Sequence, residues 1–196
     1  MGYKDLVIKS VPPEKRVEHC DGDCEWRLPE AAVMLAFAMH LLRRGEAGHV
    51  TICPDGEHGK RFQIRSWLEA HGFKRHERTG STDYGGIYNR GKKRITVYPK
   101  SGDGDVTAQI DGQLVIAETK GGIINTRHSG QVSRLCRGLC EAVGQLMVRE
   151  QNQRQIAVVP RTKNTLALAK RMTRRAKAAG VEIALVDRFG RVSYVS

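Results

Sequence analysis

The chain has 196 residues, of which 40% are hydrophobic and 28% are charged, and its formal net charge is +12. This length supports one α/β domain that buries about 70% of the surface that the unfolded chain exposes. No apolar run reaches the roughly 18 residues that a membrane span needs, and the first residues lack the apolar segment of a signal peptide. We therefore expect a cytoplasmic protein with no membrane partner.

The positive charge is concentrated in the C-terminal third of the chain. Residues 121–196 carry 14 basic and 4 acidic side chains, whereas residues 1–60 carry 8 basic and 10 acidic ones. Each phosphate that a basic side chain neutralises releases counterions, so this asymmetry indicates a polyanion partner, most simply nucleic acid. A basic surface that only keeps the protein soluble is the alternative.

Residues 1–58 are expected to form an N-terminal helical elaboration that packs on the rest of the chain. A proline is favoured at the first position of a helix, and a glycine commonly follows its last position. These two signals mark the ends of the one long helix expected in this region. The expected elements are a strand at 6–8, irregular chain to residue 27, a helix from Pro29 to about Arg44, a strand at 49–53 and a turn at 54–56.

Residues 59–196 are expected to form the core. Apolar residues recur at helical spacing in three segments and alternate or run together in strand-like segments between them. This order predicts an α/β fold with a mixed central sheet that is flanked by helices. The expected elements are a helix at 59–71, a polar loop at 76–86, a hairpin at 87–98, a hairpin at 105–120, a loop at 121–130, a helix at 131–150 capped by Ser129, a strand at 155–160, a basic helix at 164–179, and strands at 181–186 and 192–195.

The hairpin at 105–120 contains the candidate catalytic and metal-binding residues. Asp105 stands at the head of its first strand, and Glu118 and Lys120 end the second, where residues two apart point to one face. Hard cations such as Mg²⁺ prefer oxygen ligands, which the two carboxylates and the carbonyl of Thr119 can supply. A partly buried metal site would lower the pKa of Lys120, so that this amine can orient or deprotonate the attacking water. The alternative is a solvated Glu–Lys pair at a strand end.

This arrangement resembles the PD-(D/E)xK nuclease superfamily over about residues 57–160. The resemblance rests on Asp105 and on Glu118-Thr119-Lys120, with a helix before them and a helix and a strand after them. It implies a restriction-endonuclease-like fold and a Mg²⁺- or Mn²⁺-dependent nuclease. The metal ligands would be Asp105 and Glu118, and Lys120 would be the catalytic lysine. It also implies DNA as substrate, and a homodimer or a larger assembly with a motor protein in DNA repair, restriction or anti-phage defence. RNA stays an open alternative, as does the type of strand that is cut.

The segment after the hairpin adds candidate residues. In some members of the superfamily a glutamine on the next helix reaches the site, and Gln131 is the matching candidate here. Arg127, His128 and Arg134 follow Lys120 closely in the sequence, and we expect them to contact phosphates. The basic helix at 164–179 either lies along a nucleic-acid backbone or faces solvent.

The first helix of such proteins often contributes another acid near its start. If that helix is 59–71, the matching positions hold Arg61 and Gln63, which departs from the pattern. Glu57, just upstream, is the nearest substitute. Glu30 is the other candidate, if the earlier helix is the first element of the core.

Two other functions stay open. A non-catalytic subunit could keep the fold and bind nucleic acid in a salt-sensitive way without cleaving it. Alternatively, the N-terminal region could be an interaction module that a zinc ion stabilises, although the spacing of its candidate ligands matches no strong zinc motif. Those candidate ligands are His19, Cys20, Cys24, Cys53 and His58.

Overall fold

The computed structural model describes residues 2–45, 47–100, 102–149 and 152–196. The strands are β1 (Ile8–Ser10), β2 (Glu25–Leu28), β3 (His49–Ile52), β4 (Lys74–Glu77), β5 (Gly86–Arg90), β6 (Lys93–Val97), β7 (Val106–Ile110), β8 (Gln113–Thr119), β9 (Gly122–Ile123), β10 (Arg154–Pro160), β11 (Val181–Val186) and β12 (Val192–Tyr194). The helices are α1 (Glu30–Arg44), α2 (Gly56–Arg61), α3 (Ile64–Ala70), α4 (Ser129–Met147) and α5 (Lys163–Ala178).

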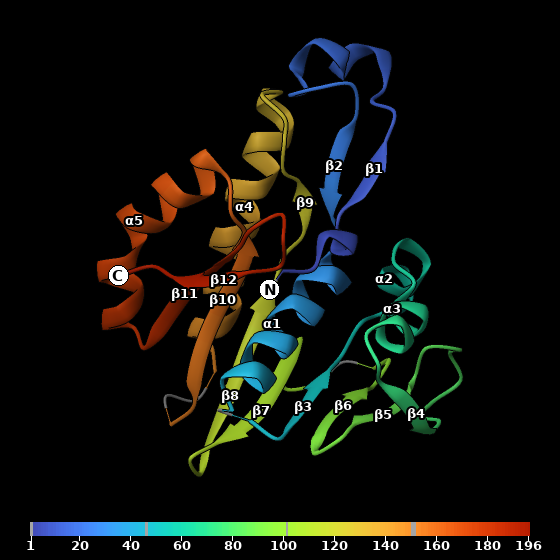
Figure 1. The fold of residues 1–196 in the computed structure, drawn as a ribbon. Helices are drawn as coiled ribbons and strands as arrows, with labels where there is room; N and C mark the ends of the chain where they lie inside the picture. The colour runs from blue at the N-terminus through green and yellow to red at the C-terminus, as the bar shows by residue number, and fades with distance from the viewer. Residues whose placement is uncertain (1, 46, 101, 150–151) are drawn as a thin grey trace.

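A mixed sheet forms the centre of the molecule. Its nine strands follow the order β12-β11-β10-β8-β7-β3-β6-β5-β4. β10 runs parallel to both β8 and β11, whereas β7 is antiparallel to both β3 and β8. Helix α1 crosses the sheet on one side, and α4 and α5 lie on the other (Figure 1). The predicted α/β class, with a mixed sheet flanked by helices, is confirmed.

Helix α1 is buried along almost its whole length. Residues 31–39, 41 and 42 each expose 1% or less of their surface. A helix enclosed on all sides needs apolar residues on every face, which explains its continuous apolar sequence. Strand β8 separates the two cores, because Val115 and Ala117 belong to the cluster of α1 and Ile116 belongs to the cluster beneath α4 and α5. No helix in the described ranges is long and apolar enough to cross a membrane.

The N-terminal region is more ordered than the sequence predicts. The strand expected at 6–8 is wrong, since Lys4–Leu6 forms a 3-10 turn and the strand begins at Ile8. The stretch expected to be irregular contains a second 3-10 segment, Glu14–His19, and strand β2. Strands β1, β2 and β9 form a separate three-stranded sheet. Because β9 lies about 95 residues after β2 in the sequence, the local pattern could not reveal this pairing.

The helix expected at 59–71 is two helices. Between α2 and α3, Phe62 adopts an extended backbone with φ −146° and ψ 131°. Its side chain is only 6% exposed and joins the core cluster of α1, so burial of this ring breaks the helix. The turn expected at 54–56 is the start of α2, where the Asp55 carboxylate accepts a hydrogen bond from the amide of His58 at 2.8 Å.

Most later elements are confirmed, and a few differ. Both hairpins, the strands at 155–160 and 181–186, and the basic helix form as expected. Both segments expected to be loops contain strand residues. Strand β4 ends within the segment 76–86, and β9 lies within the segment 121–130. Ser129 is the first residue of α4 rather than its cap, and the N-cap, His128, makes no side-chain capping bond. The expected helix end at Glu150 lies outside the described residues.

The nine-stranded sheet runs across the expected boundary at residue 58. Strand β3 comes from the predicted N-terminal elaboration, yet it pairs with β6 on one side and β7 on the other. The division into residues 1–58 and 59–196 stays a prediction. The pairing places β3 in the central sheet, whereas β1, β2 and β9 form a separate small sheet (Figure 1). Leu28 of β2 still packs in the core cluster of α1 and β3.

Candidate active site

A tight turn fixes the register of the β7–β8 hairpin. Its two central residues, Asp111 and Gly112, have φ values of 50° and 78°. Positive φ at both positions suits a two-residue hairpin turn, for which Asp-Gly is a preferred pair. In the resulting register Val106 lies opposite Ala117, which brings the preceding residue, Asp105, beside the end of β8. The hairpin therefore assembles the acidic pair that the sequence predicts.

Asp105 is held by Thr119. The amide and the hydroxyl of Thr119 both donate to Oδ2 of Asp105, at 2.7 and 2.9 Å. Burial raises the pKa of Asp105 to about 6, and the negative charges of Glu118 and Glu30 add to this rise against the two hydrogen bonds. A carboxyl group that is oriented by its neighbours but costly to ionise is typical of a functional site.

Glu118 is buried next to Asp105, and an arginine neutralises it. Only 6% of Glu118 is exposed. Nη2 of Arg149, two residues beyond the end of α4, donates to its Oε1. A buried carboxylate without a partner lowers the free energy of unfolding by several kcal/mol. The ion pair therefore allows Glu118 to be buried in the sheet.

Lys120 follows β8 and reaches two glutamates. Its Nζ lies 3.4 Å from Oε1 of Glu30 and 3.5 Å from Oε1 of Glu141. Burial lowers its pKa, but the charges of Glu30, Asp105 and Glu141 outweigh this, and the pKa is raised overall. The lowered pKa was expected for a site that holds a metal ion, so it stays a prediction. The surrounding carboxylates act in the opposite direction and favour the protonated form of Lys120.

Of the two candidate acids, Glu30 lies beside Lys120, whereas Glu57 does not. Glu30 is the first residue of α1, and besides Lys120 it contacts Nε2 of His58 at 3.6 Å. Glu57 is exposed and pairs with Lys60 at 2.7 Å. Of the two candidates, only Glu30 raises the pKa of Asp105. The described residues thus bring four carboxylates to the site, from α1, from the head of β7, from β8 and, at Glu141, from α4.

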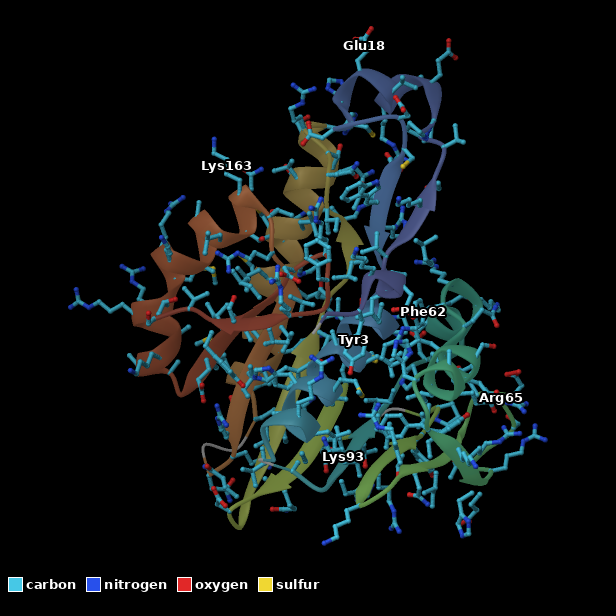
Figure 2. All side chains as sticks on the ribbon, in the orientation of Figure 1. Tyr3, Glu18, Phe62, Arg65, Lys93 and Lys163 are labelled. Carbon is cyan, nitrogen blue, oxygen red and sulfur yellow. The ribbon has the colours of Figure 1, made fainter. Side chains whose placement is uncertain are left out.

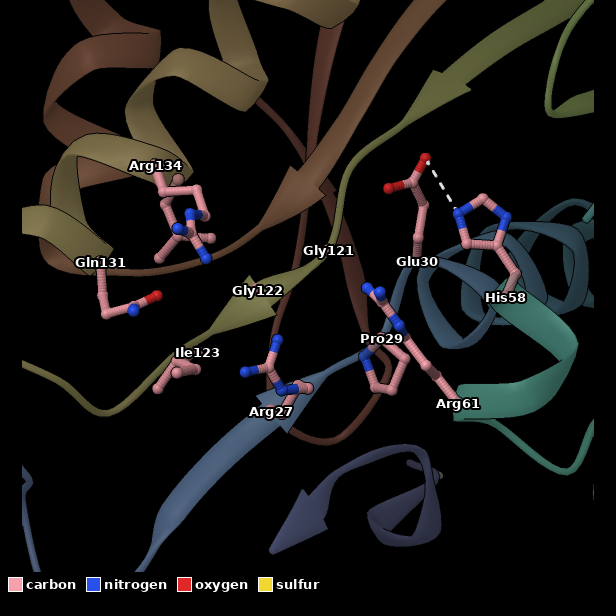
Figure 3. Close-up of a pocket in the computed structure, with 11 residues that line it drawn as sticks. Arg27, Pro29, Glu30, His58, Arg61, Gly121, Gly122, Ile123, Gln131 and Arg134 are labelled. Atoms are coloured by element: carbon pink, nitrogen blue, oxygen red, sulfur yellow. Dashed lines mark ion pairs between the residues drawn. The ribbon is translucent and has the colours of Figure 1, made fainter. Parts of the chain in front are cut away.

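A pocket of about 160 Å³ opens beside Glu30. Gln131, which is 9% exposed, and Arg134 line it from the first turns of α4. The backbone of Gly121–Gly122 runs along it, and a side chain at Gly121 would meet the backbone at Leu28 and Glu30. Figure 3 shows Arg27 and Arg61 pointing into the same space from β2 and α2.

The predicted phosphate contacts are divided between two places. Arg134 lines the pocket, as expected for a phosphate ligand. Arg127 is largely exposed and lies 3.4 Å from Asp21. The ring of His128 packs on the ring of His19, with centroids 5.2 Å apart. Arg127 and His128 thus contact the N-terminal region and do not line the pocket.

Four side chains of this site carry no signal in the sequence that predicts a role there. Arg27, Arg61 and Arg149 are isolated basic residues whose local sequence gives no functional signal. His58 was considered only as a zinc ligand. The only common signal is compositional, namely the excess of arginine in a chain with a net charge of +12.

The carboxylates have the chemistry that Mg²⁺ requires, but two of them pair with a cation of the chain itself. Oxygen donors at Asp105 and Glu118 suit a hard cation, and burial, with the charge of Glu118 adding to it, raises the pKa of Asp105. Arg149 pairs with Glu118, and Lys120 pairs with Glu30. Within the described residues, no three His, Cys, Asp or Glu side chains are gathered to hold a metal ion. A divalent cation at Asp105 and Glu118 would therefore compete with Arg149.

The candidate zinc ligands have different neighbours. No described contact joins all five residues. The described part of the chain also contains no group of three or more His, Cys, Asp or Glu side chains that could hold a metal ion. His19 packs on His128, Cys24 accepts a hydrogen bond from Trp26, Cys53 lies near Asp105, and His58 contacts Glu30. The zinc hypothesis stays a prediction that no observed cluster supports.

No protein-family model, curated protein or solved structure matches this chain.

Proposed function

We propose that the protein is a metal-dependent nuclease that hydrolyses phosphodiester bonds, most simply in DNA. One observation carries the proposal: carboxylates from three separate elements surround one lysine at the end of β8. Glu30, Asp105 and Glu141 supply the carboxylates, Lys120 is the lysine, and Glu118 adds its negative charge beside Asp105. Beside them lies a pocket lined with arginines, which suits a polyanionic substrate.

The arrangement of elements supports the family resemblance. In sequence order, α1, β3, β7, β8, α4 and β10 give a helix, three antiparallel strands, a helix and a strand that is parallel to β8. This is the order that accompanies the resemblance to PD-(D/E)xK nucleases, with α1 in place of the helix at 59–71. The segment from α2 to β6 is then an insertion between β3 and β7.

In the proposed reaction each side chain has a separate task. A bound Mg²⁺ or Mn²⁺ supplies Lewis-acid stabilisation of the phosphate and lowers the pKa of water. Asp105 and Glu118 would hold it, and Thr119 orients Asp105 through its amide and hydroxyl. Lys120 stabilises negative charge that develops on the phosphate, because its own charge is kept by the surrounding glutamates. Glu30 positions Lys120.

A non-catalytic nucleic-acid-binding subunit is the second candidate, and one observation favours it. The cation that neutralises Glu118 belongs to the chain itself, since Arg149 already pairs with this carboxylate. A site that uses its carboxylates only for such ion pairs would need no metal. This candidate predicts binding that weakens with salt and no cleavage under any metal.

A cleavage assay separates the two candidates. Purified protein is incubated with plasmid, linear duplex, single-stranded and branched DNA and with single-stranded and duplex RNA, in Mg²⁺, in Mn²⁺ or in EDTA. A nuclease is expected to cut at least one substrate with metal and none with EDTA. Binding to these substrates without cleavage in either metal would instead support the non-catalytic subunit.

Glu30→Gln and Glu57→Gln form a matched pair that tests which helix serves the site. We expect Glu30→Gln to lower the cleavage rate by about tenfold or more, because Lys120 loses the carboxylate that positions it. Glu57→Gln removes only an exposed ion pair with Lys60, so its cleavage rate should stay within about twofold of the wild type. Initial rates on the best substrate give both values, and equal losses in the two variants would refute the assignment of Glu30.

Arg149→Met tests the competition between Arg149 and a metal. Without metal, the free energy of unfolding is expected to fall by about 1–3 kcal/mol, because Glu118 stays buried and loses its partner. Mn²⁺ binding, measured by calorimetry, should become tighter because the carboxylate is released. Arg137→Met, on the exposed surface of α4, is the control and should change neither quantity. Weaker Mn²⁺ binding in Arg149→Met would contradict the competition.

A further inference from the structure

Three arginines from different parts of the chain point into one pocket. Arg27 comes from β2 in the N-terminal sheet, Arg61 from the end of α2 and Arg134 from α4. Figure 3 shows their guanidinium groups directed toward the Gly121–Gly122 backbone from separate sides. These arginines are separated by 34 and 73 positions in the sequence, so only the fold brings them together.

The protein itself does not neutralise this cluster. In the described part of the chain, neither Arg27 nor Arg134 forms a salt bridge, and Arg61 has only a distant one, at 3.9 Å from Glu57. The single carboxylate in the pocket, Glu30, is already shared by Lys120 and His58. Positive charge therefore accumulates in the pocket without a matching anion.

The surroundings of Arg27 disfavour the charged form of its guanidinium group. Burial lowers the pKa of Arg27, and the nearby charges of Arg16, Arg61 and Arg134 lower it further, against the opposing effect of Glu25. A fold gains no stability from pressing guanidinium groups together. Such a local conflict, in a concave site, is expected where a ligand of opposite charge completes the structure.

We propose that Arg27, Arg61 and Arg134 form a binding pocket for a phosphate group of the nucleic-acid substrate, next to the phosphate that is cleaved. Guanidinium groups bind phosphate oxygens through paired N–H donors, and the amide of Gln131 adds a further polar group to the wall. Glu30 lines the pocket and contacts Lys120, so the pocket and the proposed catalytic lysine share one wall.

This inference rests on the proposed function for the identity of the substrate, but not for the binding of phosphate itself. It gives the N-terminal sheet a role, since β2 supplies Arg27 and pairs with β9, which carries Gly122. The phosphate can be the terminal monoester of a strand or an internal diester. Both offer the same charged oxygens, and the experiment distinguishes them.

Binding is measured on the full chain in EDTA, so that no cleavage interferes. Inorganic phosphate is titrated by calorimetry, and short duplex DNA with a phosphate at the 5′ end, at the 3′ end or at neither end is titrated by fluorescence anisotropy. The variants are Arg27→Gln, Arg61→Gln and Arg134→Gln. Arg174→Gln, which removes the same charge from the exposed face of α5, is the control.

We expect each pocket variant to weaken the binding of phosphate and DNA by about tenfold, and the control by about twofold at most. A loss confined to one phosphorylated end would identify a terminal phosphate, and an equal loss on all duplexes would identify an internal one. Thermal unfolding in the absence of ligand shows that the variants are folded, and Arg27→Lys, which keeps the charge, should lose less than Arg27→Gln.

The outcomes for the pocket and for the nuclease are separable. Pocket variants that bind phosphate and DNA as well as Arg174→Gln does would refute the pocket, even if the wild type cleaves DNA. Loss of binding in the pocket variants would support the pocket, even if no metal produces cleavage, in which case only the nuclease proposal fails.

Discussion

Lys120→Ala is expected to lower the rate of metal-dependent cleavage by about 10²- to 10³-fold, the usual effect of removing one electrostatic contact to a transition state. The structure keeps this amine protonated, because Glu30, Asp105 and Glu141 raise its pKa. In the proposed reaction we therefore expect it to contribute positive charge at the phosphate. Single-turnover cleavage rates, measured with saturating protein, give this loss without the complication of product release.

Lys120→Arg separates charge from proton transfer. An arginine stays protonated at any working pH, so it can replace a cation in part but cannot accept a proton. We expect Lys120→Arg to cleave measurably faster than Lys120→Ala, while DNA binding in EDTA changes little in either variant. If both variants are equally inactive and both are folded, Lys120 acts as a base, contrary to its surroundings in the structure. Cleavage by Lys120→Ala at the wild-type rate would remove Lys120 from the mechanism.

The hairpin could be predicted because its signals are local. Asp111-Gly112 specifies a tight turn, and the alternation on both sides sets a register that brings Asp105 beside Glu118. The apolar stripe of α4 and the apolar sequence of α1 are equally local patterns. Each of these elements is determined within about 20 residues, which is the range over which periodicity can be read.

The rest of the site depends on contacts that no local pattern encodes. Glu30 lies 90 positions before Lys120, and Arg27 lies 107 positions before Arg134. The sequence left Glu30 and Glu57 as alternatives, because the choice depends on which helix packs beneath the sheet. Similarly, no local pattern reveals that three acids approach Lys120 from α1, from the head of β7 and from α4 and raise its pKa.

The basic residues divide into two groups that composition alone cannot separate. The arginines of the pocket converge on the Gly121–Gly122 backbone from three different elements. Those of α5 lie on the outer surface, where Figure 2 shows Lys163 directed away from the body of the molecule. A surface of the second kind contributes mainly through counterion release, whereas guanidinium groups that converge on one pocket can bind a phosphate at a fixed position. This difference makes Arg174→Gln a suitable control for Arg27→Gln.

Asp105→Asn is expected to stabilise the protein at high pH while it abolishes cleavage. The pKa of Asp105 is about 6 in the folded protein, above its ordinary value of 3.8, so the folded state binds the proton more tightly than the unfolded state does. Stability from the protonated carboxyl is therefore present at low pH and is lost as the pH rises from about 4 through about 6. Asparagine is neutral throughout and keeps an oxygen that can accept the hydrogen bonds from Thr119.

The free energy of unfolding of Asp105→Asn should exceed that of the wild type by roughly 3 kcal/mol at pH 8, by about half of this at pH 5, and by little at pH 4. Urea denaturation at the three pH values measures the difference. Asp103→Asn, an exposed neighbour in the same loop, is the matched control and should show no such trend. Mn²⁺ should raise the stability of the wild type at pH 8 more than that of Asp105→Asn, because the variant keeps only one of the two proposed metal ligands, Glu118, which already pairs with Arg149. An Asp105→Asn protein that is no more stable than the wild type at pH 8 would show that the ionised Asp105 carboxylate does not destabilise the folded protein. The site would then lack the unbalanced negative charge that makes it suitable for a divalent cation.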